Sequence, residues 1–97
     1  MSEYRLTQAA EDDLLEAFIY GFETFGRQQA EEYRDSMIRC FELLAENPRL
    51  GRKADDFAAG ARRHEHAQHV IFYDEQPYGV LIIGIVHVRS IRHLLAD

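Results

Sequence analysis

The sequence predicts an α+β fold in which an antiparallel helical hairpin packs on a small, mostly antiparallel sheet, in the order β-α-α-β-β-β. Two observations support this prediction. Between Thr7 and Asn47, apolar residues recur every three or four positions, which is the period of amphipathic helices. Beyond Gly60, short β-forming segments lead to a near-continuous apolar run of eleven residues, Val80–Ser90. That run predicts a central strand covered on at least one side, with His87–Arg92 emerging at the sheet margin.

The N-terminal part of the chain predicts an edge strand followed by a helix. Tyr4–Leu6 alternates in polarity, as a short edge strand does. Thr7 is a good N-cap, and the acidic residues after it favour the positive end of the helix dipole. Apolar side chains repeat every four residues from Leu14 to Phe22, which predicts a helix of about five turns. Gly26 is the expected residue just past its C-terminus.

A second amphipathic helix follows almost at once. The three-to-four spacing continues from Ala30 to Leu44, and Asn47-Pro48 ends it. Because the link between the two helices is short, they form an antiparallel hairpin. Residues 48–60 lose the pattern and predict a surface connection.

Three strands complete the predicted sheet. Ala61–Glu65 is polar and edge-like, whereas Gln68–Asp74 is strongly β-forming. Glu75–Gly79 is a turn that joins this strand to Val80–Ser90 as a β-hairpin. Ile91–Leu95 is expected to form one closing helical turn.

Strict alternation along the last strand predicts which side chains share a face. Five residues are expected on one side of the sheet: Leu81, Ile83, Ile85, His87 and Arg89. The residues between them are expected on the other side.

Length, charge and cysteine content limit the class of protein. Ninety-seven residues predict one domain, 1–97, and no apolar run approaches the roughly 18 residues of a membrane helix. The N-terminus lacks a secretory signal, and the single cysteine, Cys40, cannot form a disulfide within the chain, so we expect a cytoplasmic protein. The net charge of −6 argues against a broad nucleic-acid-binding surface.

Clustered histidines raise the question of a metal site. His64, His66 and His69 lie within six residues, and the first two would share a strand face. No cysteine partner, helical carboxylate–histidine spacing or water-activating Glu motif accompanies them. We therefore expect solvated or sheet-bonded histidines, with no metal and no cofactor.

Four arginines are the remaining candidates for a functional site. Arg62 and Arg63 lie on the first strand after the connection, and Arg89 and Arg92 lie at the end of the last strand. If they gather at one sheet margin with His87, they form a site for phosphate or for a partner's carboxylates. Alternatively, they form only surface ion pairs with the acidic hairpin, each worth about 0–1 kcal/mol. The spacing does not choose between these interpretations.

Several segments together resemble the ParE toxins of the RelE/ParE superfamily. They keep the same order and spacing over nearly the whole chain: Tyr4–Leu14, Glu46–Arg52, Gly60–Arg63, His69–Tyr73 and Val86–Arg89. The resemblance implies the β-α-α-β-β-β fold and the toxin of a type II toxin–antitoxin pair. It also implies a ParD-type antitoxin, which wraps its C-terminal segment around the toxin, and DNA gyrase as the target. RelE relatives instead cut messenger RNA in the ribosomal A site with basic side chains.

Charge favours the ParE activity over the RelE activity. A ribosome-dependent nuclease must stabilise developing phosphate charge in an RNA-lined site, so it is expected to be basic, whereas this chain is acidic. Arg62 corresponds to an arginine of RelE-type enzymes and Arg89 lies near another, but only Lys53 can correspond to their lysines. We therefore expect a binding protein with no catalytic residue. A RelE-type ribonuclease, or a non-toxic relative that binds only the antitoxin, remains the alternative.

The resemblance suggests roles for two groups of residues. We expect Arg62, Arg63, Arg89 and Arg92, with His87, to contact gyrase and acidic antitoxin side chains. Four apolar residues of the helical hairpin lie off its main rows: Ile19, Tyr20, Ile38 and Leu43. A covering partner or the sheet itself can bury them. We expect Leu43 to pack on the sheet, and Tyr20 and Ile38 to meet the partner.

Overall fold

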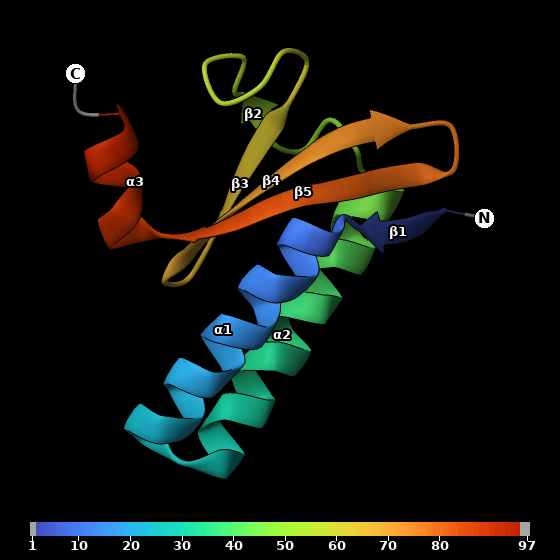
Figure 1. Cartoon of the computed structure of the whole chain (residues 1–97). Coiled ribbons are helices and arrows are strands. Elements are labelled where there is room, and N and C mark those ends of the chain that lie inside the picture. Colours follow the sequence, from blue (N-terminus) through green and yellow to red (C-terminus); the bar gives the residue numbers. More distant parts are fainter. Residues whose placement is uncertain (1, 96–97) are drawn as a thin grey trace.

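A computed structural model describes the backbone of residues 2–95 and the side chains of residues 2–91. Its helical hairpin, α1 (Gln8–Phe25) and α2 (Arg27–Glu46), lies against one face of a sheet (Figure 1). In the described residues this sheet has five strands: β1 (Glu3–Leu6), β2 (Arg52–Lys53), β3 (Arg62–His66), β4 (His69–Gln76) and β5 (Gly79–His87). A third helix, α3 (Val88–Leu95), follows β5 directly. The predicted α+β fold and element order are confirmed, with β2 as an unpredicted addition.

The strands are arranged in the order β1-β5-β4-β3-β2. β1 runs parallel to β5, and the other neighbours are antiparallel, as the prediction of a mostly antiparallel sheet requires. The close approach of β1 depends on Gly79, whose φ is +143°. A Cβ atom at this position would collide with the carbonyl oxygen of Glu3. Only glycine adopts this backbone conformation without strain and leaves room for the edge strand.

Capping residues fix the ends of α1 where the sequence predicts them, and a hydrogen bond attaches the helix to the sheet. The Thr7 hydroxyl accepts a hydrogen bond from the Ala10 amide (3.1 Å) and caps α1. Gly26, at φ +92°, ends α1 and leads straight into α2. Asp13 then ties α1 to the sheet, because its carboxylate accepts a hydrogen bond from the Ile85 amide (2.9 Å).

The prediction for the last strand was wrong at its end and in its side-chain alternation. β5 stops at His87, three residues early, because the His87 ring accepts a hydrogen bond from the Arg89 amide and so caps α3 (3.1 Å). Within β5, Ile83 is an extra residue, since Phe72 pairs with Gly84 and Tyr73 with Ile82.

This bulge changes which residues share a face. Val80, Ile82 and Ile85 all enter the core beneath the helices, where strict alternation had placed Ile85 opposite the other two. Ile83 packs on the far side of the sheet, away from Ile85. The helix-facing core also contains Met37, Phe41 and Leu44 of α2.

The opposite face of the sheet is covered by the segment between α2 and β3, which was predicted to be a surface connection. Phe57 stacks on Phe72 with their ring centroids 3.8 Å apart. On the helix-facing side of the sheet, the buried hydroxyl of Tyr73 accepts a hydrogen bond from the Gly51 amide and donates one to the Pro48 carbonyl, both at 2.8 Å. These contacts explain why residues 48–60 follow a defined path, including the short strand β2. Within the described part of the chain, no helix combines the length and apolar character needed to cross a membrane.

Candidate functional site

The helical hairpin projects beyond the sheet (Figure 1). Two adjoining cavities of about 350 and 480 Å³ lie between the hairpin and the junction of β5 with α3. Five residues line both of them: Ala17, Tyr20, His69, His87 and Arg89. We call this combined feature the hairpin groove.

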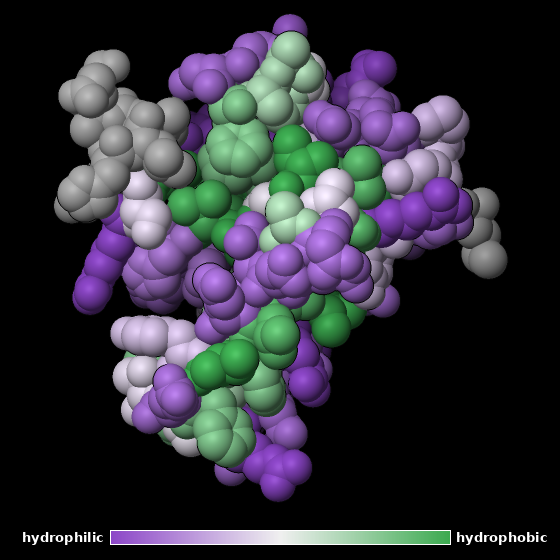
Figure 2. All heavy atoms as spheres, viewed as in Figure 1, coloured by the Kyte–Doolittle hydropathy of each residue, from purple (hydrophilic) through white to green (hydrophobic). Residues whose placement is uncertain are grey.

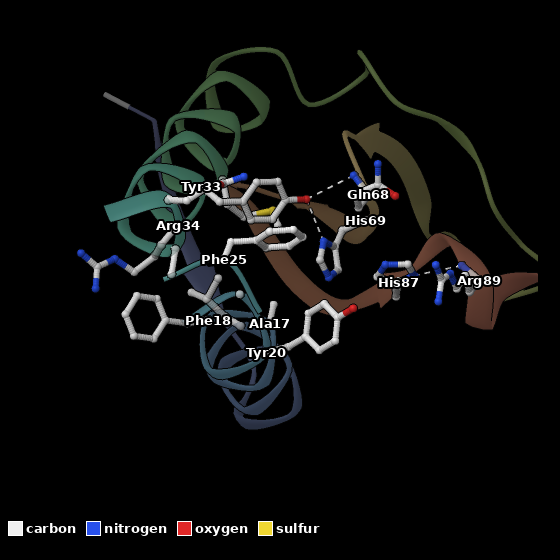
Figure 3. A pocket seen from close by; sticks show the side chains of 15 residues that line it. Ala17, Phe18, Tyr20, Phe25, Tyr33, Arg34, Gln68, His69, His87 and Arg89 are labelled. Carbon is white, nitrogen blue, oxygen red and sulfur yellow. Dashed lines mark hydrogen bonds between the residues drawn. The ribbon is translucent and has the colours of Figure 1, made fainter. Parts of the chain in front are cut away.

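One wall of the hairpin groove is apolar. Phe18 and Phe25 of α1 line it, and Tyr20 presents its ring to the same space as His87 and Arg89 (Figure 3). Phe25 and Tyr20 are exposed because no strand lies beneath this part of the hairpin. The wall therefore offers aromatic surface to a partner.

The floor of the hairpin groove is polar and hydrogen-bonded. The Tyr33 hydroxyl lies 2.7 Å from Nδ1 of His69 and accepts a hydrogen bond from the Gln68 amide (3.3 Å). Beside the floor, outside both cavities, the hydroxyl of Ser36, one turn further along α2, lies 3.0 Å from Nε2 of His66. The rings of His69 and His87 meet edge to face, with centroids 5.2 Å apart. Side chains from α2 and from the ends of β3, β4 and β5 therefore hold the floor in a fixed arrangement.

Burial keeps His66 and His69 uncharged at neutral pH. Burial, reinforced by the neighbouring His87 and His66, lowers the pKa of His69 to about 4. Burial also lowers the pKa of His66 and raises that of the Tyr33 hydroxyl. At neutral pH the two histidines are therefore neutral hydrogen-bonding groups rather than cations.

Arginines supply the positive charge of the hairpin groove. Arg89 lines both cavities at the sheet end, and it forms no ion pair within the described residues. Arg34 lies at the hairpin end, over the Phe18 ring at 5.1 Å, and pairs with Asp35 (3.6 Å). Arg89 is therefore available for a carboxylate of a bound protein.

The structure does not gather the four predicted arginines at one margin. Arg62 and Arg63 pair with Tyr73 and Phe72, at the opposite end of β3 from the strand positions that align with His87. As neighbours on one strand they also point to opposite faces of the sheet. The expected single cluster was therefore wrong, although His87 and Arg89 do lie together in the hairpin groove.

Arg62 and Arg63 make structural contacts instead. Arg62 donates a hydrogen bond to the Gly51 carbonyl (2.7 Å), and Arg63 pairs with Glu65 (3.2 Å). The side chain of Arg92 lies outside the described residues, and its backbone belongs to α3.

The predicted apolar contacts of the helical hairpin are partly reversed. Tyr20 is exposed and lines the hairpin groove, as expected of a residue that meets a partner. Ile38 instead packs against the helix-facing core, while Leu43 is 47% exposed. The buried row of α2 runs through Leu44, and Leu43 lies about 100° away from it around the helix.

Sequence analysis did not identify Tyr33, Phe25 or Ser36 as site residues. A signal for Tyr33 exists, because it lies on the buried row between Ala30 and Met37 and so faces the sheet. Among the described residues, no three His, Cys, Asp or Glu side chains converge as a metal site requires.

Comparisons with known proteins agree with this architecture. Residues 4–93 match the family described as "ParE toxin of type II toxin-antitoxin system, parDE". The chain is 34% identical over 87 residues to Toxin ParE1 of Caulobacter vibrioides, covering 90% of each chain. It is 30% identical over 89 residues to Toxin ParE1 of Mycobacterium tuberculosis, covering 91% of each. A solved chain of the chromosomal ParDE system from P. aeruginosa has a similar fold, with a TM-score of 0.74 and 18% identity, covering 90% of this chain and 96% of that one. The chain therefore belongs to the ParE toxin family of type II toxin–antitoxin systems.

Proposed function

We propose that this ParE toxin inhibits DNA gyrase by binding to it, and that a ParD-type antitoxin neutralises the toxin by occupying the hairpin groove. The observation that carries the proposal is the groove itself, which combines exposed aromatic side chains with the guanidinium of Arg89, for which the described part of the chain supplies no carboxylate. An antitoxin segment fits this chemistry if it supplies apolar side chains for Tyr20 and Phe25 and a carboxylate for Arg89. We expect the toxin to act in the cytoplasm, where gyrase works.

Neutralisation by occlusion follows if both partners use the sheet end of the hairpin groove. Arg89 and His87 lie at the junction of β5 and α3, where a large protein can reach them. An antitoxin segment bound over the same residues would block that contact. The toxin would then be inactive in the complex and active once the antitoxin is lost.

The charges of the site support binding rather than RNA cleavage. A nuclease needs cations or proton donors around the scissile phosphate. Here the pKa values of His69 and His66 are lowered, so both rings are neutral at the pH of the cell. Arg62 donates a hydrogen bond to the Gly51 carbonyl and Arg63 pairs with Glu65. Both arginines lie at the end of β3 that is far from His87 and Arg89.

Growth arrest in cells tests the role of the predicted arginines. Induction of the toxin should stop growth with filamentation and a DNA-damage response, and co-expression of the antitoxin should prevent this. The double variant Arg89→Ala/Arg92→Ala should relieve the arrest while remaining folded. Arg49→Ala is the matched control, because Arg49 is an exposed arginine paired with Glu75, outside the hairpin groove.

Two outcomes would count against this proposal. Undiminished toxicity of the folded double variant would remove these arginines from the function. Loss of toxicity in Arg49→Ala to the same degree would show that overall charge, rather than the hairpin groove, determines the effect.

A further inference from the structure

We infer that the outer face of α1 is a second docking surface, which binds an amphipathic helix of a partner protein whose apolar stripe is flanked by Lys and Arg. This surface consists of Leu15, Ile19 and Phe22, which we call the hairpin stripe. It goes beyond the proposed function, since it lies on a different side of α1 from the hairpin groove.

The hairpin stripe is apolar and open to solvent. Its three side chains are between 46% and 57% exposed. They follow one another at positions i, i+4 and i+7, which is the spacing that one helix offers to another. The ring of Phe18 lies 6.3 Å from that of Phe22 and extends the apolar surface toward α2. Hydrophobic side chains are visible on the projecting part of the hairpin in Figure 2.

None of the three side chains of the hairpin stripe lines the hairpin groove. Successive residues are 100° apart around a helix, so Leu15 and Phe22 lie about 140–160° from Tyr20. Tyr20 faces the groove and the start of α3. A helix seated against Tyr20 therefore leaves the Leu15 and Phe22 side of α1 exposed, although Phe18 borders both surfaces.

Charge determines which kind of helix fits. α1 carries five carboxylates and no Lys or Arg. Four of them are exposed around the hairpin stripe: Glu11, Asp12, Glu16 and Glu23. The fifth, Asp13, is engaged by the Ile85 amide. A second copy of the chain would bring two such acidic helices together, which is unfavourable, whereas Lys and Arg beside the partner's apolar stripe complement them.

A pair of designed peptides tests this inference on the whole toxin. Both peptides are helices with leucines at i, i+4 and i+7; one has Lys and Arg beside the stripe and the other has Glu at the same positions. The basic peptide should bind, more weakly as salt is raised, and the acidic peptide should not. Leu15→Ser/Phe22→Ser should weaken binding at least about tenfold, because it removes half-exposed apolar area that the complex buries.

A matched variant decides which side of α1 is used. Tyr20→Ser removes an equally exposed aromatic side chain from the groove side and should leave binding of the basic peptide unchanged. Equal binding of both peptides, or loss of binding in Tyr20→Ser alone, would overturn the inference. Sedimentation of the free toxin is the second measurement: a dimer that the Leu15→Ser/Phe22→Ser variant abolishes would assign the hairpin stripe to a second copy instead. Because no gyrase is present, failure here leaves the proposed function untouched.

Discussion

Acid should destabilise the folded toxin through His69, on the floor of the hairpin groove. Burial beside Tyr33, His66 and His87 lowers its folded pKa to about 4, whereas an unfolded histidine has a pKa of about 6.5. Between these values the unfolded chain binds a proton that the folded protein does not. Stability is therefore fully present above about pH 6.5 and is lost as the pH falls toward 4.

The size of this effect follows from the same two pKa values. Between about pH 7.5 and pH 4.5, a fully shielded histidine of this kind would remove about 2.5 kcal/mol from the free energy of unfolding. The His69 ring is only half-buried, so water screens part of that term. The expected contribution is then about 1–2 kcal/mol, in addition to the loss from protonated carboxylates.

The assay compares pH dependence in the native chain and in His69→Asn. Asparagine keeps an acceptor near the Tyr33 hydroxyl but does not titrate. Urea unfolding at a series of pH values should therefore give a shallower loss of stability for His69→Asn by about 1–2 kcal/mol. His64→Asn is the control and should follow the native chain, since His64 lies on the same strand face as His66 but outside the hairpin groove.

Identical pH profiles for the native chain and His69→Asn would refute the reasoning. That result would mean that His69 is solvated and that the contact with Tyr33 does not persist in solution. A shallower profile in both variants would assign the effect to histidine content in general.

Two further predictions concern the supports of the fold. Tyr73→Phe leaves the buried Gly51 amide and Pro48 carbonyl without their partner, so chemical denaturation should show a loss of about 2–4 kcal/mol. Tyr78→Phe, whose hydroxyl makes no hydrogen bond to the described residues, should change stability little. Gly79→Ala should cost at least about 2 kcal/mol and expose β1 to hydrogen exchange, because its Cβ collides with Glu3. Gly60→Ala has a positive φ but open space, so it should cost only about 1–2 kcal/mol, and equal losses for the two variants would contradict the steric argument.

Local patterns made much of the fold predictable. Thr7 and Gly26 mark the ends of α1 because capping and left-handed geometry depend on neighbouring residues alone. The β4–β5 hairpin was equally predictable, since a turn follows a strongly β-forming segment. The bulge at Ile83 could not be predicted, because both faces of β5 are apolar and a shifted register leaves the pattern of apolar residues unchanged.

The candidate site depends on contacts between distant segments, which explains why less of it was predicted. Tyr33 and His69 are 36 positions apart and meet only when β4 docks under α2. The separation of Arg62 from Arg89 follows from the pairing of β3 with β4, which sends the two ends of β3 to opposite ends of the sheet. Tyr20 was predictable because its exposure follows from its position on α1 alone.

The dose dependence of gyrase inhibition tests the central claim most directly. Purified toxin is titrated into a supercoiling reaction at fixed gyrase concentration, with a translation-coupled RNA cleavage reaction run in parallel. A toxin that acts by binding should reach full inhibition near a fixed ratio of toxin to gyrase, and antitoxin should reverse it in proportion. The opposite result would contradict the account: far fewer toxin molecules than ribosomes would be enough to cut the transcripts, and supercoiling would stay unchanged.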